Sequence, residues 1–211
     1  MTESKPSPTH SHSRVVFAGK TDHAAGFFLL LQQGVMILRR VGCSVESFLR
    51  HEIGARQETI ELIQSVMLDG RPVDDILEAQ VSHGSTLALS AAMPGLVGAT
   101  LRRGGTYASL RSGITHREAE KTHAPGKGWV TVKLFNLVLA ELGPGLLREG
   151  VLVKAPDLLH LVAGMPQEVW LRGGGITLDG KAVAEFLLRD GGWLAEADQV
   201  LLSVVSGSTR R

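Results

Sequence analysis

The chain has 211 residues, 44% of them hydrophobic, and a formal net charge of +1 at pH 7. This length predicts one or two domains with buried cores, and the near-neutral charge provides no overall field to attract nucleic acid or an anionic membrane. One cysteine excludes an intramolecular disulfide and a cysteine-based zinc cluster, and it favours a reducing, cytoplasmic location. No apolar stretch resembles an export signal or approaches the roughly 18 residues of a membrane span, so we expect no membrane contact.

The first residues predict a disordered tail. Residues 1–14 combine Pro, Ser, Thr and His without hydrophobic periodicity, and such a composition does not offset the entropy lost on ordering. His10 and His12 could bind a metal, but a pair without a third ligand is more typical of solvated side chains.

A hairpin followed by a helix is predicted next. The run FFLLLQQGVMILRR, residues 27–40, has two apolar segments around Gln32-Gln33-Gly34, a pattern typical of two strands joined by a turn. Ser44 then offers an N-cap for an amphipathic helix that ends at Gly54.

Two further strands complete this half of the chain. They are expected over residues 62–68 and 86–92, and Asp69-Gly70 signals a turn after the first. Residues 95–114 suggest an extra hairpin that turns at Arg103-Gly104-Gly105. The polar, charged residues 113–128 then predict a linker.

Basic residues gather in and before that linker. A nucleic acid or a phosphorylated ligand could bind them, with Tyr107 as a stacking surface. One aromatic side chain makes a poor stacking platform, which favours a solvated segment and disfavours nucleic acid. The basic residues are Arg102, Arg103, Arg111, Arg117, Lys121 and Lys127.

The second half repeats the order of elements. Strands are predicted over residues 130–135, 151–154 and 200–205, with a break at Pro144-Gly145. A helix with Pro156 in its first turn ends at Gly164.

An internal repeat relates the two halves. The motif Leu68-Asp69-Gly70-Arg71-x-Val73 recurs 110 positions later as Leu178-Asp179-Gly180-Lys181-x-Val183, within the longer segments Val66 to Gly95 and Ile176 to Gly207. A repeat of domain size predicts two copies of one small fold. We therefore expect an α+β protein with two tandem β-grasp domains, residues 15–112 and 129–211, each a mixed four- or five-stranded sheet covered by one helix.

The second copy resembles the sulfur-carrier branch of the ubiquitin-like proteins, which includes the small subunit of molybdopterin synthase and the sulfur carrier of thiamine biosynthesis. The matching segments are VTVKLFNLVLAELG, VLVKAPDLLHLVAG, LDGKAV and ADQVLLSVVSG, which cover most of residues 129–207. Residues 27–97 are more faintly similar, through VMLDGRPVDD and GSTLALSAAMPG. The resemblance implies a flexible C-terminal Gly-Gly that an adenylating enzyme of the ubiquitin-activating type would modify.

The chain departs from that pattern at its end. Gly207 is followed by Ser208-Thr209-Arg210-Arg211 rather than by a second, terminal glycine, which argues against direct sulfur carriage. The internal sequence Leu101-Arg102-Arg103-Gly104-Gly105 resembles a ubiquitin-like tail, so cleavage after Gly105 could create a carrier end. A hairpin turn is the favoured interpretation, because Gly-Gly is common in turns.

Other candidates for chemistry have structural alternatives. Cys43 lies near a helix N-terminus that could activate a thiol, but His51 lies on another face and a packed thiol is favoured. Asp69, Asp74 and Asp75 could form a metal or acid/base site, although such groups are more often a turn acid and solvated loop charges. Gly173-Gly174-Gly175 precedes a strand and so does not form a phosphate loop.

These observations predict a non-catalytic protein that acts through protein-protein interaction, with no cofactor. The apolar stretch from Ala91 to Val97 is expected to meet a partner or a second copy of the chain. The alternative is a sulfur carrier or modifier matured by cleavage to expose a glycine. The residues that would serve either function are Arg102, Arg103, Gly104, Gly105 and Gly207.

Overall fold

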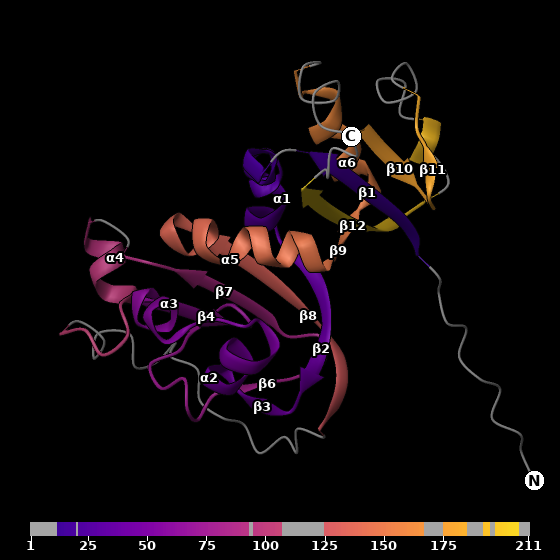
Figure 1. The fold of residues 1–211 in the computed structure, drawn as a ribbon. Coiled ribbons are helices and arrows are strands. Elements are labelled where there is room, and N and C mark those ends of the chain that lie inside the picture. The colour runs from indigo at the N-terminus through magenta and orange to yellow at the C-terminus, as the bar shows by residue number, and fades with distance from the viewer. Residues whose placement is uncertain are drawn as a thin grey trace, which may run out of the picture.

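The strands form a mixed α+β structure with one large sheet and one small sheet (Figure 1). This computed structural model describes residues 12–19, 21–92, 95–106, 125–166, 175–184, 192–194 and 197–206. The ten strands of the large sheet follow the order β11-β10-β1-β12-β9-β2-β8-β7-β4-β5. They are β1 (Ser13–Gly19), β2 (Val35–Val41), β4 (Ser65–Leu68), β5 (Arg71–Pro72), β7 (Thr86–Ser90), β8 (Gly126–Phe135), β9 (Val151–Lys154), β10 (Gly175–Leu178), β11 (Lys181–Ala182) and β12 (Gln199–Ser206). The small sheet pairs β3 (Cys43–Ser44) with β6 (Gln80–Val81).

The helices connect and cover these strands. The longest helix, α5, crosses the large sheet and contacts β7, β8 and β12 (Figure 1). Among the described residues, no helix combines the length and the apolar character needed to cross a bilayer. The helices are α1 (Phe28–Gln33), α2 (Val45–Ser47), the π-helical turn η2 (Phe48–Glu52), α3 (Gln57–Leu62), α4 (Gly95–Leu101), α5 (Asn136–Glu149) and α6 (Ala155–Ala163), with short 3-10 turns η1 (Thr21–Phe27) and η4 (Gly192–Leu194).

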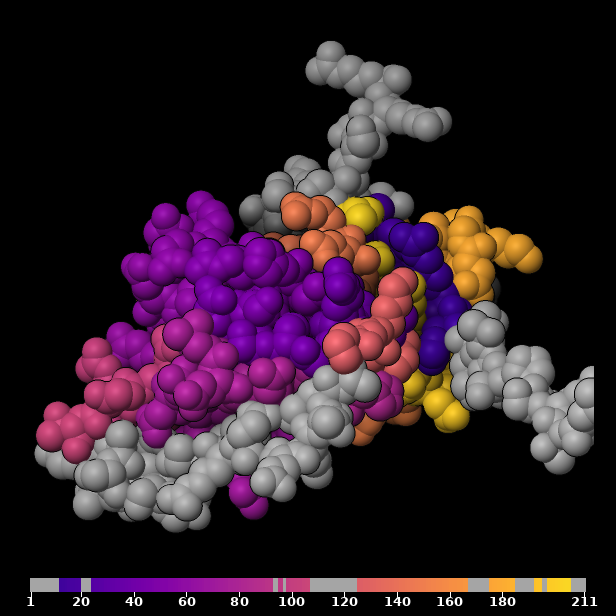
Figure 2. All heavy atoms as spheres, turned by 90° about the horizontal axis from the view of Figure 1, so that it is seen from below, coloured from indigo at the N-terminus to yellow at the C-terminus, as the bar shows by residue number. Residues whose placement is uncertain are grey.

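The first strand of each half lies between strands of the other half, an arrangement that we call strand exchange. Strand β8 lies between β2 and β7 and runs parallel to β7, and β1 lies between β10 and β12 and runs parallel to β12. The two groups of strands meet where β2 and β9 pair at Met36 and Leu152. In Figure 2, salmon residues from the β8 region lie between the purple first half and indigo β1. The predicted domains 15–112 and 129–211 are separate stretches of the chain, but both contribute strands to one sheet.

One side of the sheet packs onto a continuous hydrophobic core. Along β8, Val130, Val132 and Leu134 are buried, and the alternating residues Trp129 and Thr131 are partly exposed. Successive side chains of a strand point to opposite faces, so this alternation separates a core face from an outer face. The core cluster extends over both halves, from Phe17 and Leu31 to Leu202.

The predicted hairpin over residues 27–40 is wrong in its first arm. Residues 28–33 form α1, and only residues 35–41 form a strand. A short apolar run fits a buried strand or a buried helix equally well. Packing decides for the helix, because Phe28 and Leu31 approach Gly143 of α5 so closely that a Cβ there would lie 2.9 Å from Cδ1 of Leu31.

Other predicted boundaries change at the ends of strands. Ser13 and Arg14 belong to β1 rather than to a tail, and residues 126–128 of the predicted linker open β8. The rest of both segments, residues 1–11 and 107–124, lies outside the described residues. The predicted break at Pro144 is wrong, since Pro144 lies inside α5.

Several local predictions are confirmed. The hydroxyl of Ser44 accepts a hydrogen bond from the backbone N–H of Ser47 at 3.2 Å and so caps the predicted helix. Pro156 lies in the first turn of α6, and Asp69-Gly70 forms the predicted turn between β4 and β5. These features depend on residues close in sequence, and therefore a local pattern is sufficient to predict them.

Candidate functional site

The Arg102–Gly105 segment forms a turn after a helix. The predicted extra hairpin is wrong in its first arm, because residues 95–101 form α4. The chain then turns with Gly104 at φ +57°, and the N–H of Gly105 donates to the carbonyl of Arg102 at 3.2 Å. A Cβ on Gly105 would also lie 3.2 Å from that carbonyl oxygen, so both glycines suit a tight turn.

Arg103 anchors this turn to the sheet. Its backbone N–H donates to the carbonyl of Gln64 at 2.8 Å, and its Nη2 donates to the carbonyl of Ile63 at 2.8 Å. Ile63 follows the last turn of α3, where helix carbonyls lack partners within the helix. The Arg103 Nε is buried without a hydrogen-bond partner, and burial lowers the pKa of Arg103 while the charge of Asp75 opposes that shift.

The internal Gly-Gly therefore belongs to the fold. The N–H of Gly104 also faces Oδ1 of Asp74 at 3.4 Å, which connects the turn to the loop after β5. Gly207, the other predicted tail residue, lies outside the described residues, as β12 is described to Ser206. Arg102, Arg103, Gly104 and Gly105 thus lie together beside the start of β4.

Asp69 and Asp179 hold equivalent turns. Oδ1 of Asp69 accepts from the N–H of Thr86 at 2.7 Å, and the Asp69 N–H donates to the Thr86 carbonyl at 2.9 Å. Oδ1 of Asp179 accepts from the N–H of Arg14 at 2.7 Å, and the Asp179 N–H donates to the Arg14 carbonyl at 2.8 Å. Both aspartates have positive φ, +52° and +49°. The two carboxylates fasten strand ends rather than form a catalytic pair.

The two hydrogen bonds that each aspartate makes to the opposite strand are called its clamp here. Loss of either clamp should destabilise the protein. Asp69→Ala and Asp179→Ala each remove a charge-assisted hydrogen bond and leave at positive φ an alanine, which lacks the polar side chain that helps aspartate adopt this conformation. We therefore expect the free energy of unfolding to fall by about 1–3 kcal/mol. Asn tolerates positive φ and keeps an acceptor, so the Asn variants should lose less. Urea unfolding of the four variants measures this, and alanine variants as stable as the parent would contradict it.

The neighbouring acids also bind backbone. Oδ1 of Asp75 accepts from the N–H of Leu77 at 2.8 Å, and Oδ1 of Asp74 faces the N–H of Gly104. Within the described ranges, no group of three His, Cys, Asp or Glu side chains is placed to hold a metal ion. The alternative of a metal site at Asp69, Asp74 and Asp75 receives no support from these positions.

Cys43 lies half-buried in β3, opposite Val81. Burial raises the pKa of the Cys43 thiol, and the charge of Glu52 raises it further, against smaller opposing effects of Ser47 and Arg40. A raised pKa reduces the thiolate fraction at neutral pH and disfavours nucleophilic chemistry.

Cys43 should accordingly react slowly with iodoacetamide. Its rate at pH 8 should be several-fold below that of a cysteine in an unstructured peptide, with the midpoint of the rate-pH profile above the usual thiol pKa. Glu52→Gln removes one raising charge and should move the midpoint down. Mass-spectrometric alkylation rates test this, and a midpoint below that of the free thiol would refute it.

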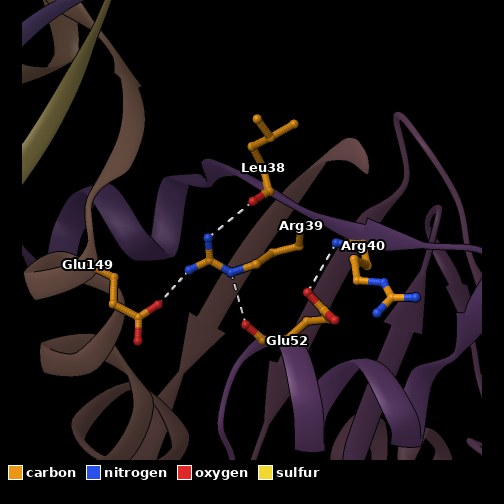
Figure 3. Close-up of polar contacts among 5 residues, drawn as sticks. All are labelled: Leu38, Arg39, Arg40, Glu52 and Glu149. Carbon is orange, nitrogen blue, oxygen red and sulfur yellow. Dashed lines mark hydrogen bonds and ion pairs between the residues drawn. The ribbon is translucent and has the colours of Figure 1, made fainter. Parts of the chain in front are cut away.

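Arg39 joins elements from both halves (Figure 3). Its Nη2 lies 2.6 Å from Oε2 of Glu149 at the end of α5, and its Nε donates to the carbonyl of Glu52 at 2.9 Å. The N–H of Arg40 donates to Oε2 of Glu52 at 3.0 Å. This group was not predicted from the sequence, because its members are far apart in the chain and share no motif.

Large exposed leucines mark possible contact surfaces. Leu96 on α4 is 72% exposed and Leu77 is 68% exposed. The prediction of an exposed stretch from Ala91 to Val97 is wrong at Ala91, which is 4% exposed because it continues the buried side of β7. Met93 and Pro94 lie outside the described residues.

Comparison with known proteins gives no relative for this arrangement. No protein-family model, no curated protein and no solved structure matches the chain.

Proposed function

We propose that the chain is a non-catalytic protein made of two related β-grasp halves, akin to sulfur carriers, and that it acts in the cytoplasm by binding other proteins. The recurrence of local contacts supports the relationship between the halves. Gly34 and Gly150 end α1 and α5 at φ +119° and +107°, and their N–H groups donate to Leu30 and Leu146. The clamps of Asp69 and Asp179 repeat in the same way.

The anchoring of Arg103 is the observation that carries the functional proposal. A carrier tail must extend into the active site of its activating enzyme, whereas the two hydrogen bonds of Arg103 hold Gly104-Gly105 against Ile63 and Gln64. Extending the tail would break both bonds and leave the carbonyl groups of Ile63 and Gln64 without these partners beside the half-buried Arg103 side chain. Interaction through the folded surface is therefore favoured over transfer through a tail.

Mass spectrometry of the intact native protein tests the proposal. We expect only the full-length chain, without replacement of a carboxylate oxygen by sulfur. A species that ends at Gly105 or Gly207, or one that carries a thiocarboxylate, would instead establish the carrier or modifier. Co-purification with an adenylating enzyme would point the same way, and a defined complex of full-length chain with another protein or a second copy would support the interaction function.

A further inference from the structure

The outer face of the large sheet has an apolar centre. Leu152 is opposite Leu201 on one neighbouring strand and Met36 on the other, and Leu38 is opposite Trp129. Leu152 is buried but lies outside the core cluster, as its position on the outer face requires. Leu38 is 43% exposed. The apolar centre therefore reaches the surface at Leu38.

Basic side chains surround that centre. Arg40 is opposite Lys127. Extending the registers Val35↔Val132 and Met36↔Leu152 to Gly34 places Lys133 and Lys154 on either side of it, which corresponds to roughly 10 Å between their Cα atoms. Arg14 extends the basic residues at the opposite β1 side, next to Leu201. None of the ion pairs among the described residues involves these side chains.

Two carboxylates approach the basic residues of this face, Glu52 at the backbone N–H of Arg40 and Asp179 at that of Arg14. The strands as described contain no Asp or Glu, and the acidic residues of the described ranges lie on helices and turns. A chain with a net charge of only +1 thus concentrates positive charge on one face of its sheet. Lys127, Lys133 and Lys154 have no ion-pair partner among the described residues, so this excess of positive charge favours an acidic partner.

The chemistry of the centre distinguishes between kinds of acidic partner. Met36, Leu38, Leu152 and Leu201 are aliphatic and offer no ring on which a base could stack. The rings of Trp129 and His12 form a T-shaped pair, with 6.1 Å between their centroids. Two copies of the chain joined through this face would bring lysines and arginines together. Aliphatic side chains flanked by carboxylates match the surface better than bases and phosphates do.

We propose that the outer face binds an acidic protein segment, with apolar side chains over Met36 and Leu38 and carboxylates beside Lys133, Lys154 and the Arg40–Lys127 pair. This inference rests on the proposed interaction function and assigns it a surface and a class of partner. The contact is electrostatically assisted, so it weakens as salt concentration rises.

Site-specific photocrosslinking of the full-length chain in its native cells tests the surface. The photoreactive residue p-benzoylphenylalanine replaces Leu38, and in a control it replaces Leu77, which is also exposed but belongs to the turn before β6. We expect adducts from position 38 that exceed those from position 77, in which the crosslinked peptide carries an excess of Asp and Glu around apolar residues.

A matched pair of charge reversals tests the chemistry. Lys133→Glu/Lys154→Glu should reduce the adduct from position 38 about tenfold, since both reversals replace attraction of the acidic segment by repulsion. Arg71→Glu/Lys181→Glu changes the net charge equally at exposed residues opposite core-facing Leu68 and Leu178, and it should leave the adduct unchanged. Circular dichroism establishes that both variants are folded.

The remaining outcomes overturn the inference. These are equal adducts at positions 38 and 77, equal losses in both double variants, a nuclease-sensitive adduct, or an adduct with a second copy of this chain. A protein adduct confined to position 77 would overturn this surface and leave the proposed interaction function intact. A glycine-terminated or thiocarboxylate species would refute the proposed function, and mass spectrometry detects it independently of any crosslink.

Discussion

Residues 125–206 expressed without the first half are expected to lack a cooperative fold. Strand β1, which separates β10 from β12, is missing from that piece, and β8 loses both β2 and β7 as neighbours. The complementary piece, residues 12–106, lacks β8, which lies between β2 and β7 in the full-length chain. Unpaired edges and exposed apolar faces would dominate both pieces, and therefore each should be unfolded or aggregated. Circular dichroism and amide NMR spectra of each piece measure this.

Mixing the two pieces should restore the native spectrum. The full-length chain cleaved within residues 107–124 serves as the control, because its strands can remain paired after the cut. A cooperative unfolding transition in either piece alone would show that each half folds independently, with its own first strand in place.

Phe17→Ala should destabilise the protein more than the loss of either aspartate clamp. Phe17 is 1% exposed, and its ring lies edge-on to Phe27 with 5.0 Å between centroids. Removing a buried phenylalanine costs about 3–5 kcal/mol, which is a large part of the 5–15 kcal/mol typical of a whole domain. Because Phe17 is opposite Val204 in the sheet, the effect should extend to the other half of the chain.

Hydrogen exchange and urea unfolding measure this effect. Amide protection in β12 should fall in Phe17→Ala, although residue 17 is far from β12 in sequence. Leu137→Ala is the control, since Leu137 is 62% exposed and its truncation should change the free energy of unfolding by less than about 0.5 kcal/mol. Normal protection of β12 in folded Phe17→Ala protein would contradict the pairing of β1 with β12.

The strand exchange also affects the test of the carrier alternative. A chain cleaved after Gly105 would retain β1 between β10 and β12 and β8 between β2 and β7. The two pieces would then remain associated under native conditions. Mass spectrometry of the proposed processing must therefore separate the chains with denaturant.

Of the candidate site, the sequence predicted only the turn, which depends on neighbouring residues. Arg103-Gly104-Gly105 marks a turn because glycine accepts positive φ, and the turn is present. Its attachment to Ile63 and Gln64 involves residues about 40 positions away, as the separation between Arg103 and Ile63 shows. The basic outer face could have been suspected from the lack of Asp and Glu in the strands, but only the register places Lys133 and Lys154 on either side of Gly34.

The amino-acid sequence by itself determined the turns at Asp69-Gly70 and at Arg103-Gly104-Gly105, the Ser44 cap, several strands and the repetition of the Leu-Asp-Gly motif, because these depend on residues within a few positions of one another. The tertiary structure decided that residues 28–33 form a helix against Gly143 and that β1 and β8 each join the other half. An alternating apolar pattern shows that one face of a strand is buried, but it does not identify the neighbouring strand. That choice depends on which edges become available when both halves share one core.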